Sequence, residues 1–160
     1  MTQDITLEIG SKAPNFSAAD HSGLNYSLDD LIGEGKTIVL YFYPKDNTPG
    51  CTIQACDFRD NISILQSKDI IVLGVSKDSA SSHEKFVSKY DLNFPLLIDT
   101  DLSIHKSYGV WQEKINYGKK YMGTVRSTFV IGPDGTLEWL GYNVKAKGHV
   151  EKLMHELSIK

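Results

Sequence analysis

The fold of this 160-residue chain is decided by ThrIleValLeuTyrPheTyr, residues 37–43, and IleIleValLeuGlyVal, residues 70–75. Both are unbroken apolar runs rich in β-branched and aromatic residues, a pattern typical of strands buried on both faces of a sheet. Between them, apolar residues at helical spacing predict a crossover helix over residues 51–66, namely Ala55, Phe58, Ile62 and Leu65. A strand, a helix and a second strand in this order form a βαβ unit, in which the two strands lie parallel.

The rest of the chain extends this unit. Ser81 and Glu84 have the spacing of a capping box for a helix that runs to Tyr90, and a strand is expected over residues 94–98. Two further strands, residues 127–131 and 137–140, flank GlyProAspGly, whose residues favour the tight turn of an antiparallel pair. An amphipathic helix is then indicated by the spacing of Val150, Leu153, Met154 and Leu157.

The element order β-α-β-α-β-β-α is that of the thioredoxin fold, an α/β fold with a central mixed sheet flanked by helices. Ahead of it, residues 16–28 predict an added N-terminal β-hairpin, followed by a short helix near residues 28–32. A chain of this length buries about 70% of its unfolded surface, enough for one substantial core. We therefore expect residues 1–160 to form a single domain.

Composition narrows the classes of function. The chain is 41% hydrophobic and 23% charged, as in ordinary globular domains, and its net charge is −3 with the 17 basic residues scattered. Nucleic acid is therefore not an expected partner.

The longest apolar run, residues 38–43, is too short to span a membrane, and the first ten residues lack the pattern of a signal peptide. We expect a cytoplasmic protein that does not enter membranes.

Cys51 is the first candidate for chemistry, because it opens the predicted helix after ThrProGly and so lies near unpaired backbone N–H groups. An unperturbed thiol, with a pKa near 8.5, is only about 3% ionised at pH 7. Lowering that pKa to about 5.5–6.5 takes roughly 3–4 kcal/mol. A helix end provides about 0.3–1 kcal/mol, up to ~2 in a partly buried geometry. A nearby cation should provide the rest, and Arg126 is the candidate.

A lone cysteine followed by apolar helical spacing is more often a small buried apolar residue than a nucleophile, and Cys56 shifts the interpretation of Cys51 towards catalysis. Five residues along an ideal helix correspond to about 140° and roughly 8–9 Å between Cα atoms, beyond the ~7 Å limit for a disulfide. The two thiols therefore cannot bridge while the helix is intact. This placement suits cysteines that meet only transiently.

Other chemistries fit less well. A thioredoxin-type reductase uses Cys-x-x-Cys, whereas four residues intervene here. A zinc site needs about four ligands, and the histidines nearest in sequence to the cysteines, His21 and His83, lie about 30 residues away without ligand spacing. Neither a metal nor another cofactor is expected.

Residues 41–60, TyrPheTyrProLysAspAsnThrProGlyCysThrIleGlnAlaCysAspPheArgAsp, closely resemble the active-site segment of peroxiredoxins of the bacterioferritin comigratory protein type, also called the Q type. The family's Pro-x-x-x-Thr-x-x-Cys signature is present as Pro44, Thr48 and Cys51, with a second cysteine at Cys56. ArgSerThrPheValIle, residues 126–131, resembles another family landmark, and the similarity covers about residues 10–157.

The resemblance implies a thiol-dependent peroxidase that reduces hydrogen peroxide and alkyl hydroperoxides. Cys51 would become a sulfenic acid and condense with Cys56 to a disulfide, which thioredoxin or a similar dithiol would reduce. Thr48 and Arg126 would stabilise the leaving oxygen, and Pro44 would shape the loop and shield the sulfur. A monomer is expected rather than a dimer.

Two alternatives from other classes use the same cysteines. One is a thiol-disulfide oxidoreductase that acts on proteins, and the other is a non-catalytic sensor that signals through oxidation of Cys51 and Cys56. Arg59 has two readings as well: it orients Arg126, or it forms a surface ion pair with Asp57 or Asp60, and we favour the ion pair.

Overall fold

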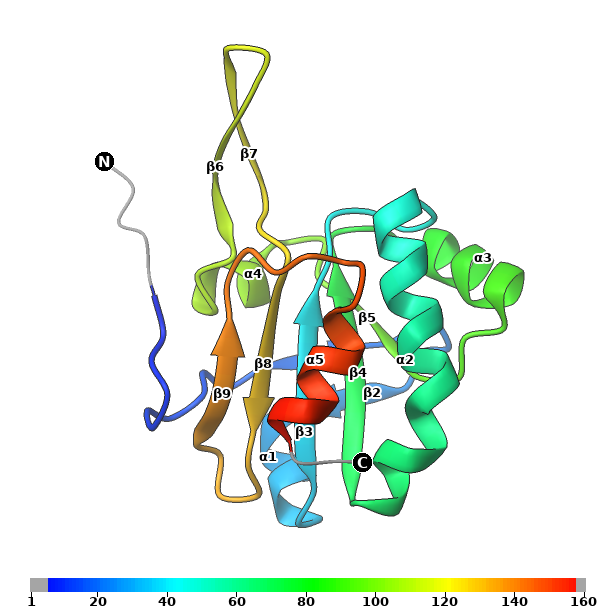
Figure 1. Cartoon of the computed structure of the whole chain (residues 1–160), viewed down its shortest axis with the longest axis vertical. Helices are drawn as coiled ribbons and strands as arrows, with labels where there is room; N and C mark the ends of the chain where they lie inside the picture. Colours follow the sequence, from blue (N-terminus) through cyan, green and yellow to red (C-terminus); the bar gives the residue numbers. More distant parts are fainter. Residues whose placement is uncertain (1–5, 158–160) are drawn as a thin grey trace.

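A computed structural model describes residues 6–157, and its centre is a five-stranded sheet in the order β5-β4-β3-β8-β9 (Figure 1). The strands β3, β4 and β5 are parallel to one another, whereas β8 and β9 are antiparallel to their neighbours. The bounds of these strands are Thr37–Phe42 for β3, Ile70–Ser76 for β4, Leu96–Ile98 for β5, Ser127–Ile131 for β8 and Leu137–Gly141 for β9.

The central strand β3 is buried on both faces, as its unbroken apolar run predicts. Val39 and Tyr41 contribute to the core on one face of the sheet, and Ile38, Leu40 and Phe42 to the core on the other. Because successive side chains of a strand point to opposite faces, a strand in the middle of a covered sheet has no polar face.

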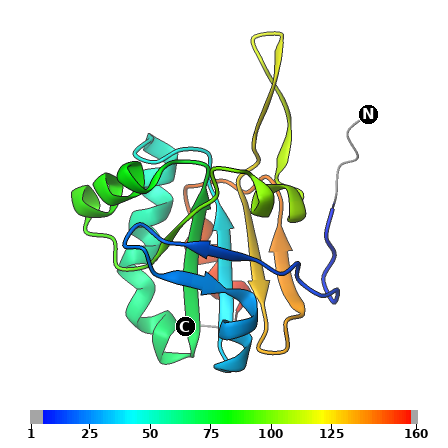
Figure 2. The same ribbon diagram turned by 180° about the vertical axis from the view of Figure 1, so that it is seen from behind.

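Helices and the N-terminal hairpin cover the two faces of the sheet. The helices α2, Pro49–Ser67, and α5, His149–Glu156, pack on one face, and Phe86 of α3, Ala80–Tyr90, joins the same core. The other face is covered by α1, Leu28–Gly33, α4, Ser103–Ser107, and the hairpin of β1, Ser17–Ala19, and β2, Asn25–Ser27, as Figure 2 shows from behind. This architecture confirms the thioredoxin fold and the added hairpin.

The predicted capping box at Ser81 and Glu84 is wrong. The N-cap of α3 is Ser79, whose hydroxyl accepts a hydrogen bond from the backbone N–H of Ser82 at 3.2 Å. Ser79 has the extended backbone that an N-cap requires, with ψ of 166°, whereas Ser81 already lies within the first turn.

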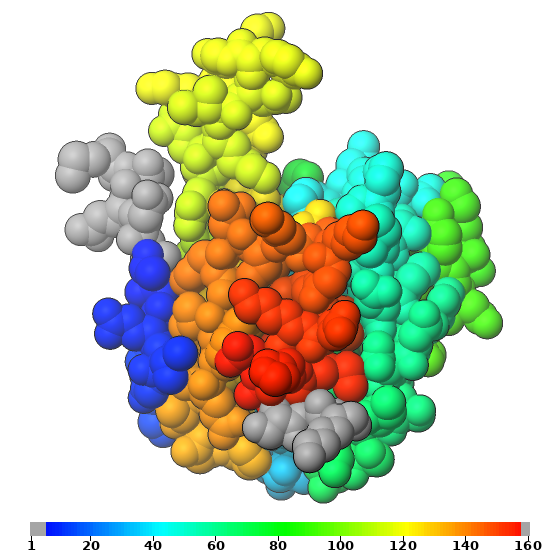
Figure 3. Space-filling model, in the orientation of Figure 1, coloured from blue at the N-terminus to red at the C-terminus, as the bar shows by residue number. Residues whose placement is uncertain are grey.

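A second hairpin was not predicted. The strands β6, Trp111–Asn116, and β7, Lys119–Thr124, project from the body of the molecule and have no substantial packing against another described helix or strand (Figures 1 and 3). Tyr117 and Gly118 at its tip both have positive φ, 52° and 76°, as a two-residue type I′ turn requires. The TyrGly pair was the sequence signal for this turn.

Within residues 6–157, no helix has the length and apolar character needed to cross a membrane.

Candidate active site around Cys51

Cys51 lies in the first turn of α2, at the end of the sheet where β3 finishes (Figure 1). Thr48 is the N-cap residue, with an extended backbone, and Pro49 starts the helix, a position where its missing N–H costs no hydrogen bond. The Cys51 side chain is only 2% exposed. Its sulfur is thus close to the positive end of the helix dipole and largely shielded from water.

Arg126 meets Cys51 as predicted. Its Nη2 donates a hydrogen bond to the Cys51 Sγ at 3.3 Å, from the short connection between β7 and β8. Gly50 makes this approach possible, because a Cβ atom at that position would be 3.2 Å from Nη2. The guanidinium is a permanent cation, so a full positive charge lies next to the sulfur.

Gln54 holds the other side of the Arg126 guanidinium. Its Oε1 accepts a hydrogen bond from Arg126 Nη1 at 2.6 Å, and the Gln54 side chain is fully buried. Gln54 lies three residues after Cys51 on α2, so one helical turn carries both partners of the guanidinium. Its Nε2 has no hydrogen-bond partner among the described residues.

The positive charge of Arg126 also lowers the pKa of neighbouring groups. Burial, followed by the positive charges of Arg126 and Lys152, lowers the pKa of His149 from 6.5 to about 4, so this histidine is neutral at pH 7. Burial and then Arg126 lower the pKa of Lys114, in the middle of β6, while Cys51 opposes this shift. The site therefore concentrates positive charge around one sulfur.

Tyr41 belongs to the same buried cluster as Cys51. Its hydroxyl is buried and has no hydrogen-bond partner among the described residues. Burial raises the pKa of Tyr41 well above 10, and the charge of Cys51 adds to this effect, so the hydroxyl stays protonated.

Thr48 and Pro44 lie in the loop that leads into α2, and both are half-buried. The Thr48 hydroxyl donates to the carbonyl oxygen of Lys45 at 2.8 Å, which leaves its oxygen lone pairs for a hydrogen bond from a ligand. Pro44 has no side-chain polar atom to contribute. The structure thus places both residues in the loop beside the first turn of α2.

Asp46 anchors this loop to the rest of the molecule. Its carboxylate accepts hydrogen bonds from the Tyr43 hydroxyl at 2.6 Å and the Ser82 hydroxyl at 2.8 Å, and it contacts His83 Nδ1 at 2.7 Å. Its backbone N–H donates to Asp78 Oδ2 at 2.8 Å. The loop before Cys51 is therefore tied to β3 and α3 by buried polar contacts.

His83 links three parts of the structure through its ring. Nδ1 lies 2.7 Å from Asp46 Oδ2, and Nε2 lies 2.9 Å from the carbonyl oxygen of Leu97 in β5. Because the side chains of His83 and Asp46 are almost fully buried, this pair joins α3, β5 and the loop away from water.

Cys56 lies on another side of α2 and is partly exposed, while both cysteines are free thiols. The unbroken helix over both residues confirms that they cannot bridge in this state. Arg59 forms an ion pair with Asp60 at 3.0 Å and donates to the carbonyl oxygen of Tyr90 at 2.6 Å. The ion-pair interpretation of Arg59 is thus confirmed, and Gln54 takes the orienting role instead.

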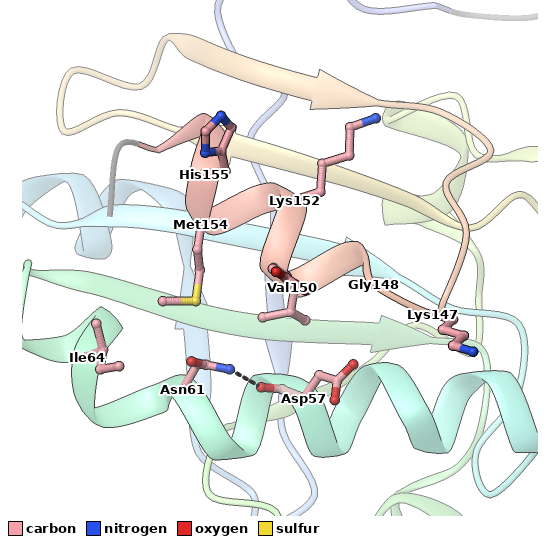
Figure 4. A pocket seen from close by; sticks show the side chains of 10 residues that line it. Asp57, Asn61, Ile64, Lys147, Gly148, Val150, Lys152, Met154 and His155 are labelled. Atoms are coloured by element: carbon pink, nitrogen blue, oxygen red, sulfur yellow. Dashed lines mark hydrogen bonds between the residues drawn. The ribbon is translucent and has the colours of Figure 1, made fainter. Parts of the chain in front are cut away.

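A groove of about 960 Å³ lies between α2 and α5 (Figure 4), and neither Cys51 nor Arg126 lines it. Asp57 and Asn61 line it from α2, and Lys147 and His155 from the C-terminal segment. Among residues 6–157, no group of three or more His, Cys, Asp or Glu side chains is arranged to hold a metal ion.

Sequence reasoning missed Gln54, Gly50 and the pair of Asp46 and His83. Gln54 sits three residues after Cys51, and this spacing was a usable signal because residues i and i+3 share a helix face. The pairing of Asp46 with His83 had no local signal, since 37 residues separate the two.

Comparison with known proteins agrees with this site. The family model described as AhpC/TSA family matches residues 9–140, so the chain belongs to the AhpC/TSA family, and its relatives there are peroxiredoxins, the thiol peroxidases among the oxidoreductases. Peroxiredoxin Bcp of Bacillus subtilis is 46% identical over 155 residues, which cover 96% of each chain.

Solved structures extend the likeness to the Q type. A cysteine-to-serine variant of Xylella fastidiosa PrxQ has a TM-score of 0.89 at 34% identity, covering 96% of this chain and 97% of that one. The Xanthomonas campestris bacterioferritin comigratory protein, studied for alkyl peroxide reduction, has a TM-score of 0.84 at 34% identity, covering 89% and 90%. The resemblance to peroxiredoxins of this type is therefore confirmed.

Proposed function

We propose that this peroxiredoxin uses Cys51 as the residue that attacks the peroxide and Cys56 as the residue that resolves the product. The observation that carries the proposal is the hydrogen bond from Arg126 Nη2 to the Cys51 Sγ, in the first turn of a helix. A buried sulfur at a helix N-terminus with a guanidinium beside it favours a thiolate nucleophile.

In the first step, the Cys51 thiolate attacks one oxygen of hydrogen peroxide or an alkyl hydroperoxide. The sulfur–oxygen bond forms as the O–O bond breaks, so the sulfur is oxidised to a sulfenic acid, and the departing hydroxide or alkoxide takes a proton to leave as water or alcohol. Arg126 and the backbone N–H of Cys51 stabilise the negative charge on the leaving oxygen. Because the Thr48 hydroxyl donates to Lys45, Thr48 accepts a hydrogen bond from the peroxide and orients it, instead of stabilising the leaving oxygen as the resemblance implied. Pro44 keeps water from the sulfur.

In the second step, the Cys56 thiolate attacks the sulfenic sulfur of Cys51, and water leaves as the disulfide forms. A dithiol donor of the thioredoxin type then reduces this disulfide and returns both thiols. The free state of both cysteines, one buried and one partly exposed, supports this order of events. We further propose that the chain acts as a monomeric single domain in the cytoplasm.

Two cysteine variants test the proposal. Cys51→Ser should lose peroxide turnover and keep its fold. Cys56→Ser should still consume one equivalent of peroxide but recycle poorly with thioredoxin and thioredoxin reductase. Turnover retained by Cys51→Ser would exclude Cys51 as the nucleophile, and recycling at the parental rate by Cys56→Ser would exclude Cys56 as the resolving residue. An absence of peroxide consumption by the parent protein would favour a disulfide oxidoreductase or a sensor.

A further inference from the structure

The projecting hairpin of β6 and β7 exposes an apolar tip. Four of the large hydrophobic side chains that are exposed among the described residues lie on it: Ile115, Tyr117, Tyr121 and Met122, with exposures of 70%, 98%, 47% and 40%. An isolated two-stranded hairpin is marginally stable in water at best. A hairpin that extends from the body with apolar residues exposed therefore points to a partner that covers it.

The hairpin is also basic. The hairpin carries three lysines, Lys114, Lys119 and Lys120, and one acidic residue, Glu113, in a chain whose net charge is −3. This local excess of positive charge matches a partner surface that is acidic around an apolar centre. Two copies of the same hairpin, meeting across a two-fold axis, would bring their lysines together, so pairing with a second copy of this chain is disfavoured.

The base of the hairpin reaches the active site. Lys114 Nζ donates to the carbonyl oxygen of Thr124 at 2.8 Å, two residues before Arg126. Gly123 leaves room for the Lys114 side chain, because a Cβ there would lie 2.9 Å from the Lys114 Cδ. A macromolecule that reaches the cysteines from this end of the sheet, where the hairpin rises in Figures 1 and 3, passes beside the hairpin.

We propose that the hairpin of residues 111–124 is the docking element for the protein that reduces the oxidised enzyme, a dithiol protein with an acidic and apolar surface around its reactive cysteine. This inference rests on the proposed function, which requires such a donor. In the reaction, the donor thiolate attacks one sulfur of the Cys51–Cys56 disulfide and its second thiol releases it, so the enzyme gains two electrons and the donor becomes a disulfide.

The test compares a protein donor with a small dithiol. Lys119 and Lys120 are exposed, so the double variant Lys119→Glu/Lys120→Glu should fold normally. With thioredoxin, thioredoxin reductase and NADPH, its KM for thioredoxin should rise about tenfold, as expected when charges at the rim of an interface are reversed. With dithiothreitol as the donor, turnover should stay at the parental rate. Ile115→Ser/Tyr117→Ser should give the same pattern with less dependence on salt.

The matched control is Lys12→Glu/Lys68→Glu, which makes the same change of charge at exposed positions away from the hairpin. An unchanged KM for thioredoxin in both hairpin variants, or an equal rise in the control, would overturn the docking role. Binding of the parent to anionic lipid vesicles that the hairpin variants lose, with thioredoxin kinetics unchanged, would assign the hairpin to a membrane surface instead. Failure of the proposed function is seen separately, because the parent would then not turn over peroxide even with dithiothreitol.

Discussion

At the scale of single residues, Arg126 is held by two partners from the same turn of α2. Cys51 Sγ and Gln54 Oε1 accept from its two terminal nitrogens. A lysine would offer one point charge without this fork, so it could not serve both partners in the same way. The orientation of the guanidinium thus depends on a buried amide that takes no part in the proposed chemistry.

We expect Arg126→Ala to slow the reaction of Cys51 with peroxide by about 10²–10³, the usual effect of losing one donor to a transition state. Arg126→Lys should recover part of the rate. Gln54→Leu should slow the reaction about 10- to 100-fold, because a hydrogen bond to a charged group is worth roughly 1.5–3 kcal/mol. Stopped-flow measurement of peroxide reduction gives these rates.

The control for Gln54→Leu is Gln66→Leu, the same change at an exposed position near the end of the same helix. A similar loss of rate in both variants would remove Gln54 from the positioning role. A rate of peroxide reduction that is unchanged in Arg126→Ala would show that Arg126 does not assist the reaction of Cys51.

At the scale of elements, α5 is fixed to the sheet through a neutral histidine. His149, at the start of α5, shares a 2.8 Å hydrogen bond with the Thr128 hydroxyl of β8, and its side chain is buried. Its pKa, lowered first by burial, is about 4 in the folded protein, against about 6.5 for an exposed histidine. The unfolded chain therefore binds a proton at this residue more readily than the folded one.

We expect acid to destabilise the protein through His149. The stability that depends on neutral His149 is fully present above pH 6.5 and is lost as the pH falls towards 4. Below pH 4 the loss amounts to roughly 3 kcal/mol of the free energy of unfolding. Urea denaturation at pH 7 and pH 4.5 measures this change. His149→Gln should reduce the pH dependence over this interval, whereas His155→Gln, at an exposed position on the same helix, should leave it unchanged. Equal pH dependence in His149→Gln and the parent would contradict the argument.

At the scale of the whole molecule, the chain segments before and after Thr48 are held in place very differently. Before it, Asp46 ties the loop to α3 and β5 through His83 and Ser82. After it, the first turns of α2 must change shape for the disulfide to form, since the Cα atoms of Cys51 and Cys56 have to approach within ~7 Å. Oxidation should therefore unwind α2 from its start while the preceding loop keeps its place.

Amide hydrogen exchange in the reduced and oxidised forms measures this change. We expect residues 50–57 to lose protection on oxidation, and α3 to keep it, because the buried pair of His83 and Asp46 is undisturbed. The first aromatic residue past this segment, Phe58, stacks on Tyr41 with ring centroids 4.6 Å apart and should limit the unwinding. Equal protection of residues 50–60 in the two forms would mean that the disulfide does not form by unwinding. The same comparison in Cys56→Ser, where no such disulfide forms, is the control.

The sequence alone determined the central strands, the crossover helix and the place of Cys51 at its start, because burial on both faces and helical periodicity are local patterns that the folded chain satisfies. It also indicated Arg126, since the arithmetic for a thiolate required a cation. Only the tertiary structure decided which residues hold Arg126 in place and which residues anchor the loop before Cys51. Gln54, Gly50, Asp46 and His83 act through contacts between elements that are distant in sequence, as do the packing of His149 and the projection of the second hairpin. Apart from the i, i+3 spacing of Gln54 from Cys51, such contacts leave no periodic trace, because they depend on where whole elements meet rather than on the local preference of the chain.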